Sequence, residues 1–237
     1  DELLAPCPRT PEVVREHRHD YYAVITGLDE NIGRILAELT RQGLDRNTII
    51  IYSADHGLSI GSHGLFGKQS LYEDSIKPPL IITGPGIRAG KTDALVYLMD
   101  LFPTAVELAG GTVPQGLDGK SLKPVIDRTA PRVRNSLFLA YGKVQRAARN
   151  DRWKLIRYPH INKNQLFDLS KDPHEMHNLA DDPGYEAKTM EMMRELIRLQ
   201  KQYGDTEHLV STEPKEQSWT PPQGEELREI RKRWKME

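Results

Sequence analysis

Apolar residues recur at intervals of three and four between residues 20 and 42, which is the spacing of one face of an amphipathic helix. The recurring residues are Ile25, Leu28, Ile32, Leu36 and Leu39. Gly43 is expected to end this helix, because glycine commonly follows the last helical turn. The prolines at positions 6, 8 and 11 indicate an extended segment before it.

Two short apolar runs follow, and both predict buried strands. Residues 48–53 are Thr-Ile-Ile-Ile-Tyr-Ser, and residues 79–83 are Pro-Leu-Ile-Ile-Thr. Continuous β-branched runs are typical of parallel strands that are covered on both faces. Helical spacing resumes over residues 95–108, where Pro103 requires a kink or the first turn of a second helix. This order predicts an α/β domain with a mixed or parallel sheet and flanking helices.

The pattern changes after residue 135. Three short strands are expected at residues 136–141, 145–150 and 153–158, and a two-residue turn between the last two predicts a β-hairpin. A long helix is expected over about residues 184–203. Strands followed by a helix predict a small antiparallel α+β subdomain. The expected divisions are part of an α/β domain (1–135), the small subdomain (136–203) and a polar tail with a short helix (204–237).

Composition argues against several classes of protein. The 237 residues include 33 Lys and Arg against 34 Asp and Glu, a balance that favours neither a nucleic-acid partner nor a charged membrane surface. No apolar run approaches the roughly 18 residues that a membrane span needs. Cys7 is the single cysteine, so a framework of intrachain disulfides is excluded.

The residues whose side chains could bind a metal or an anion follow directly after the first predicted strand. Asp55, His56 and Gly57 follow it directly, and a loop interrupted by glycines then carries His63 and ends at Lys68. Open α/β sheets bind ligands beyond the carboxyl ends of their strands, so the acid and imidazole are candidate metal ligands and the lysine a candidate anion contact. The alternatives are a helix cap for Asp55, a turn residue for His56, and a backbone-bonded loop histidine for His63.

Further motifs surround this group in one order between residues 22 and 180. They are YAVITGLDENIGRIL from residue 22, SADHG from 53, Gly67-Lys68 with Tyr72-Glu73, PLII with Pro85-Gly86, DLFPT with Ala109-Gly110, GLDG with Ser121-Leu122, Trp153-Lys154-Leu155, and LFDL with Asp172-Pro173, Glu175 and Asn178-Leu179-Ala180. In this order they resemble the sulfatase family of the alkaline-phosphatase superfamily, in its iduronate-sulfatase-like subtype with an Asp-His pair.

The resemblance implies an alkaline-phosphatase-like fold and hydrolysis of sulfuric esters. It implies that Asp55 and His56 ligate a divalent metal and that Lys68 contacts the sulfate. Calcium is the metal that the resemblance favours, although Zn²⁺ or Mn²⁺ suits an imidazole ligand better. His63 is a further candidate, as a contact to the substrate or leaving group. A phosphonate or phosphate ester hydrolase of the same superfamily and a non-catalytic sulfatase-like domain stay open as alternatives.

The family's nucleophile motif is absent from this chain. Sulfatases use a formylglycine made from the first residue of Cys/Ser-X-Pro-X-Arg, whereas the proline and arginine after Cys7 stand at the wrong offsets. The chain is therefore expected to be the C-terminal half of a sulfatase, inactive alone, whose N-terminal half supplies the formylglycine and an early pair of metal-binding aspartates. The expected partners are that half and a small-molecule or carbohydrate sulfate ester. The sequence leaves the compartment open, and only the resemblance suggests a periplasmic, extracellular or lysosome-like one.

Overall fold

The computed structural model of the chain describes residues 4–5, 9–218, 220 and 222–233. Cys7 lies outside the described residues. In chain order the elements are α1 (Pro11–Arg41), η1 (Asp45–Asn47), β1 (Ile50–Ser53), η2 (Ser62–Gly64), α2 (Glu73–Ile76), β2 (Leu80–Thr83), η3 (Leu98–Asp100), α3 (Leu101–Leu108), α4 (Lys123–Ile126), β3 (Ser136–Tyr141), β4 (Gln145–Asn150), β5 (Trp153–Tyr158), η4 (Pro159–Ile161), β6 (Lys163–Asp168), η5 (Pro183–Tyr185), α5 (Glu186–Gln202) and α6 (Gly224–Arg233).

The first helix, α1, begins at Pro11, so the predicted start near residue 20 is wrong, and Pro11 and Glu12 of the expected extended segment are helical. The side chain of Thr10 caps the helix by accepting a hydrogen bond from the Val13 amide. Pro11 occupies the first turn, where its missing N–H leaves no helical hydrogen bond unmade. None of the residues of α1 is buried against the rest of the described chain.

The two strands predicted from apolar runs are present as β1 and β2, but they pair with each other and run antiparallel. Ile50 lies opposite Thr83, and Ser53 lies opposite Leu80. The expected parallel, fully buried arrangement is therefore wrong for this pair, although the α/β class is confirmed. An apolar run indicates that a strand will be covered, but it does not specify the direction of the neighbouring strand.

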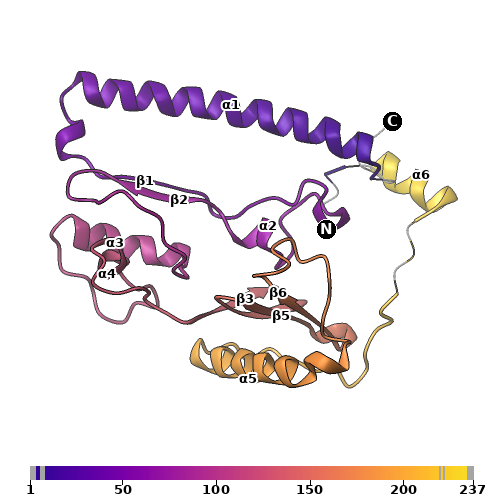
Figure 1. The fold of residues 1–237 in the computed structure, drawn as a ribbon. Coiled ribbons are helices and arrows are strands. Elements are labelled where there is room, and N and C mark those ends of the chain that lie inside the picture. Colours follow the sequence, from indigo (N-terminus) through magenta and orange to yellow (C-terminus); the bar gives the residue numbers. More distant parts are fainter. Residues whose placement is uncertain (1–3, 6–8, 219, 221, 234–237) are drawn as a thin grey trace.

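The four remaining strands form an antiparallel sheet in the order β3-β4-β5-β6, which confirms the predicted small subdomain sheet and its hairpin. Figure 1 shows α5 lying along one face of this sheet. Alternate strand residues pack on α5; they are Ala148, Leu155 and Leu166, against Met192, Leu196 and Leu199. The helix starts at Glu186, close to the predicted position.

The opposite face of the same sheet is also covered. Ala147, Ile156 and Phe167 point to this side and pack against Leu71, just before α2. An antiparallel sheet commonly leaves one face in water, whereas this one is buried on both. The segment around α2 therefore belongs to the core of the small sheet, although it is distant from the sheet in sequence.

A fully buried carboxylate, Asp100, fixes the connection into β3. It accepts hydrogen bonds from the backbone N–H groups of Tyr97, at 2.7 Å, and Lys120, at 2.8 Å. The guanidinium of Arg134 completes the arrangement at 2.6 Å. Pro103 lies in the first turn of α3, as the sequence predicts. Among the described helices, none combines the length and apolar character that crossing a membrane requires.

Candidate active site

The Asp-His pair lies just past the end of β1, and its two side chains approach each other. His56 Nε2 lies 3.1 Å from Asp55 Oδ2, and the His56 amide donates to Asp55 Oδ1 at 3.0 Å. The other ring nitrogen, Nδ1, lies 3.0 Å from the carbonyl oxygen of Gly57. Because a carbonyl oxygen can only accept, Nδ1 carries the proton in this contact, and Nε2 is then the nitrogen left to bind a metal. Histidines that ligate metals are commonly oriented in this way.

The spacing of these two donor atoms fits a shared cation. Two ligands 3.1 Å apart can both bind one ion at bond lengths of about 2.3 Å, as hard divalent cations require. Asp55 is largely exposed, with 76% of its side chain accessible. Among the described residues, no group of three or more His, Cys, Asp or Glu side chains could hold a metal ion. The described chain therefore offers a pair of ligands rather than a full coordination sphere.

The loop between Gly57 and Lys68 folds back on itself. Ser59 N–H donates to the carbonyl of Gly67, and Gly61 N–H to that of Leu65, so the two arms run side by side. Phe66 and Ser59 are buried at the base of the loop. This ladder of backbone hydrogen bonds between the two arms brings Lys68 back toward the end of β1, where the loop began.

The short helix α2 supports both ends of this loop. Gly57 N–H donates to the carbonyl of Ser75 at 2.8 Å, and the Ser75 hydroxyl lies 2.9 Å from that of Ser70. Ser70 N–H in turn donates to the Lys68 carbonyl at 2.8 Å. A Cβ at position 57 would lie 2.0 Å from the Asp74 carbonyl oxygen, so only glycine fits between the loop and α2.

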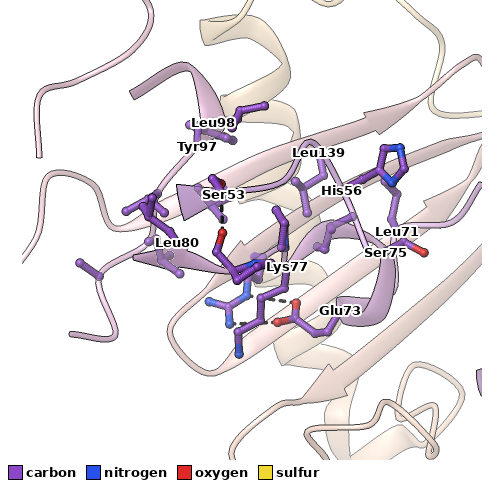
Figure 2. Close-up of a pocket in the computed structure, with 18 of the residues that line it drawn as sticks. Ser53, His56, Leu71, Glu73, Ser75, Lys77, Leu80, Tyr97, Leu98 and Leu139 are labelled. Carbon is purple, nitrogen blue, oxygen red and sulfur yellow. Dashed lines mark hydrogen bonds and ion pairs between the residues drawn. The ribbon is translucent and has the colours of Figure 1, made fainter. Parts of the chain in front are cut away.

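Asp55, His56 and Lys68 line one cleft of about 1080 Å³. Figure 2 shows Ser53, His56 and Glu73 at this cleft, together with Leu139 of the small sheet. The structure thus brings together the acid, the imidazole and the lysine that the sequence singles out. Leu137 and Leu139 of β3 give one wall an apolar surface.

The third candidate on the loop, His63, is placed differently and is not among the described residues that line the cleft. Its ring stacks on Tyr72, with centroids 3.8 Å apart and planes 7° from parallel. Its backbone adopts the left-handed conformation, with φ at 55°. Burial lowers the pKa of His63, because it disfavours the charged imidazolium. A contact between His63 and a substrate stays a prediction.

Comparison with known proteins places this fold and cleft in a family. The family model described as N-sulphoglucosamine sulphohydrolase, C-terminal, matches residues 61–202, and the model described as sulfatase matches residues 5–111. The chain belongs to the sulfatase family. This sulfatase chain is 36% identical over 207 residues to the N-acetylglucosamine-6-O-sulfatase of Bacteroides thetaiotaomicron. The match covers 81% of this chain and 37% of that protein, so the chain spans little more than a third of its relative.

Solved structures resemble the sulfatase chain over the same portion. One, a protein in complex with its substrate D-glucosamine-2-N,6-O-disulfate, matches with a TM-score of 0.75 and 35% identity, over 81% of this chain and 42% of that one. The phosphonate monoester hydrolase of Silicibacter pomeroyi matches with a TM-score of 0.74 and 27% identity, over 85% of this chain and 44% of that one. These similarities confirm the expected alkaline-phosphatase-like α/β fold.

The sulfatase cleft also contains cations that the sequence pattern did not indicate. Arg149 comes from β4, and Lys77 follows α2. Arg149 contacts the carboxylate of Glu73 at 3.3 Å, and this ion pair borders the cleft. No local spacing could have identified Arg149, because only the packing of the small sheet against α2 brings it there.

Proposed function

We propose that the full-length protein containing this chain hydrolyses sulfuric esters, and that Asp55, His56 and Lys68 belong to its active site. The observation that carries the proposal is their convergence on one cleft in a chain of the sulfatase family. The order of motifs along the sequence and the placement of these side chains in space point to the same cleft. Agreement between them supports the assignment of these residues.

Asp55 and His56 are proposed to hold a divalent cation, calcium by family resemblance, with Zn²⁺ or Mn²⁺ as the ions that imidazole also suits. The 3.1 Å separation of their donor atoms supports this role. A bound cation would neutralise negative charge on the oxygens of the ester. The Gly57 carbonyl contributes by fixing the His56 ring, so that Nε2 is presented to the ion.

Lys68 is proposed to bind the sulfuryl group. Its side chain is exposed at the cleft, and among the described residues no carboxylate lies within ion-pair distance of it. Its charge is therefore available to an anion. A lysine head group acts as a point charge that donates hydrogen bonds to the tetrahedral sulfate oxygens. Such a contact strengthens as negative charge builds up on those oxygens during the reaction.

The nucleophile and the remaining metal ligands are proposed to come from an N-terminal half of the same protein, which would carry the formylglycine. The match covers only 37% of the curated relative, which supports a longer functional protein. Exposed apolar residues on α1, including Ile25, Leu28 and Leu36, offer a surface for that half. The described β1–β2 pair stands alone, and a two-stranded sheet is only marginally stable without further packing.

A carbohydrate sulfate is the proposed substrate class. The matched Bacteroides relative is named for a sulfated amino sugar, and the solved neighbour described above holds one as its substrate. A second candidate, a phosphonate or phosphate monoester, rests on the structural match to the phosphonate monoester hydrolase. Both classes present a tetrahedral anion to a metal and a lysine, so the cleft residues alone do not distinguish them.

Assays of the full-length protein on matched sulfate, phosphate and phosphonate esters with one common leaving group would test the proposal. We expect the largest kcat/KM on the sulfate ester, and loss of most of it in Lys68→Ala. A larger kcat/KM on the phosphonate ester would favour the second candidate. A correctly folded full-length protein without turnover on any of the three, or on sulfated glucosamine, would instead indicate a non-catalytic sulfatase-like domain.

A further inference from the structure

A cluster of four charged side chains lies between the small sheet and α2, and two of them, Lys154 and Glu175, are buried. Lys154 of β5 is fully buried, and its Nζ lies 2.6 Å from Glu175 Oε1 and 3.2 Å from Glu73 Oε1. Glu175 is almost as inaccessible, with 1% of its side chain exposed. Arg149 of β4 donates hydrogen bonds to both carboxylate oxygens of Glu73, each at 3.3 Å. The two cations and two carboxylates balance in charge.

Stability alone does not account for Lys154 at this position. Lys154 points to the same side of the sheet as Ile156, which packs against Leu71 and Phe167. An apolar residue would suit such surroundings, and replacing a buried ion pair by apolar residues is commonly neutral or stabilising. An ion pair differs from an apolar contact in that it fixes direction and distance. The ion pairs therefore indicate that the two carboxylates contacted by Lys154 must be placed accurately.

The cluster fixes the position of Glu73, the first residue of α2. Besides its contact with Lys154, Glu175 accepts a hydrogen bond through Oε2 from the backbone N–H of Glu73 at 2.6 Å. Glu73 therefore engages the cluster through both its amide and its carboxylate. Burial raises the pKa of Glu175, while Lys154 opposes this by favouring the charged carboxylate. Without Lys154, Glu175 would be left as an uncompensated buried acid.

Two residues further along α2, Ser75 holds both ends of the cleft loop. Its carbonyl accepts from Gly57, next to His56, and its hydroxyl meets Ser70, whose amide donates to the Lys68 carbonyl. A continuous series of contacts thus runs from β5 through α2 to the backbone beside His56 and Lys68. We propose that Lys154 is a positioning residue for the cleft, which sets the metal-ligand pair and the sulfate-binding lysine through Glu73 and Glu175.

This inference rests on the proposed function for its catalytic consequence, but its structural consequence can be measured separately. The test uses full-length protein carrying Lys154→Met, in which the side chain keeps its length and loses its charge. Arg146→Met is the matched control. Arg146 is equally buried, lies on β4 of the same sheet and pairs with Asp205 at 2.8 Å, but it points to the α5 side and does not contact α2.

We expect Lys154→Met to speed hydrogen–deuterium exchange in peptides covering residues 57–70 by about tenfold, since local opening there would cost less free energy. Peptides from α5 should exchange as in the wild type. We expect kcat on a sulfate ester to fall on the order of tenfold to a hundredfold, as for other small misplacements of catalytic groups. In Arg146→Met, both the exchange rate of the peptides covering residues 57–70 and kcat should stay close to their wild-type values.

Unchanged exchange in residues 57–70 of a folded Lys154→Met protein would overturn the inference. Equal effects of Arg146→Met on the loop would also overturn it, because they would indicate a general loss of stability. If Lys154→Met does not fold, the charge-balanced variant Lys154→Met with Glu175→Gln serves in its place, with the same expected result. If the wild type hydrolyses no ester, the exchange measurements still decide the positioning role, and only the proposed function fails.

Discussion

Replacing Gly57 by alanine should disturb the cleft, because the added methyl group would meet the backbone of α2. Gly57 lies between His56 and the ladder of the loop, and its own N–H donates to the Ser75 carbonyl. An added Cβ would lie 2.0 Å from the carbonyl oxygen of Asp74 and 3.1 Å from its carbonyl carbon. The obstacle is helix backbone, which cannot rotate away as the end of a flexible side chain can.

The size of the effect follows from this distance. Real Cβ atoms approach other heavy atoms to no less than 3.0 Å, so the loop and α2 must separate by about 1 Å. Overpacking of this kind typically costs about 1–3 kcal/mol of folding free energy. A misplacement of about 1 Å at catalytic groups can cost a hundredfold in rate. Because the backbone of Gly57 is not in the left-handed region, the whole cost is steric.

The assay is steady-state turnover of a sulfate ester by the full-length protein, together with its free energy of unfolding in urea. Gly33→Ala is the matched control, because a Cβ at this position in α1 meets nothing within 4 Å. That change should stabilise the helix by roughly 0.5–1 kcal/mol and leave turnover unaltered. If Gly57→Ala retained the turnover and stability of Gly33→Ala, α2 could not be a rigid support of the loop.

Four further outcomes are expected. Lys68→Ala should lower turnover by about a hundred- to thousandfold while changing the free energy of unfolding by less than about 1 kcal/mol. Lys68→Arg should recover only part of the rate. Near-normal turnover of Lys68→Ala would show that Lys68 is not part of the site. Asp100→Asn should destabilise the protein in urea by about 3–5 kcal/mol, since it leaves a buried guanidinium without its counterion; a loss under about 1 kcal/mol would contradict this. The hydrogen bonds from Arg152 hold the pKa of Asp168 below its usual value, so this carboxylate stabilises the fold above about pH 4 and loses that contribution as the pH falls. Asp168→Asn should therefore flatten the acid side of the stability curve, and an unchanged pH dependence would refute the assignment. The chain alone should show no arylsulfatase turnover, and turnover that survives Cys7→Ala would require another nucleophile.

Three of the four strands of the small sheet could be predicted from local sequence signals, whereas β6 was not predicted. The bounds of β3, β4 and β5 agree with the predicted ranges, and a two-residue turn leaves little choice of hairpin register. The start of α1 was missed, although Thr10 followed by Pro11 is a local capping signal. The direction of β1 against β2 has no such signal. It depends on neighbouring segments rather than on the residues of either strand.

Part of the candidate site could likewise be predicted from the sequence, and part could not. Asp55, His56 and Lys68 are close in sequence, so one loop at the end of a strand suffices to group them. Lys154 could not be found from the sequence, because in a half-buried strand a lysine is ordinarily placed toward solvent. Its burial becomes evident only when α2 covers that face of the sheet, and the two segments are about eighty residues apart.

The distribution of burial indicates which part of the chain holds the cleft in place. No residue of α1 or β1 is fully buried, whereas Leu155, Ile156 and Leu166 of the small sheet are completely inaccessible. Burial of apolar surface is the main stabilising contribution to folding, so the described chain is held most firmly at that sheet. The cleft loop is joined to the sheet through Leu71 and α2 rather than through β1. The proposed site residues of the α/β portion therefore depend for their position on a sheet that contributes mainly one wall of the cleft.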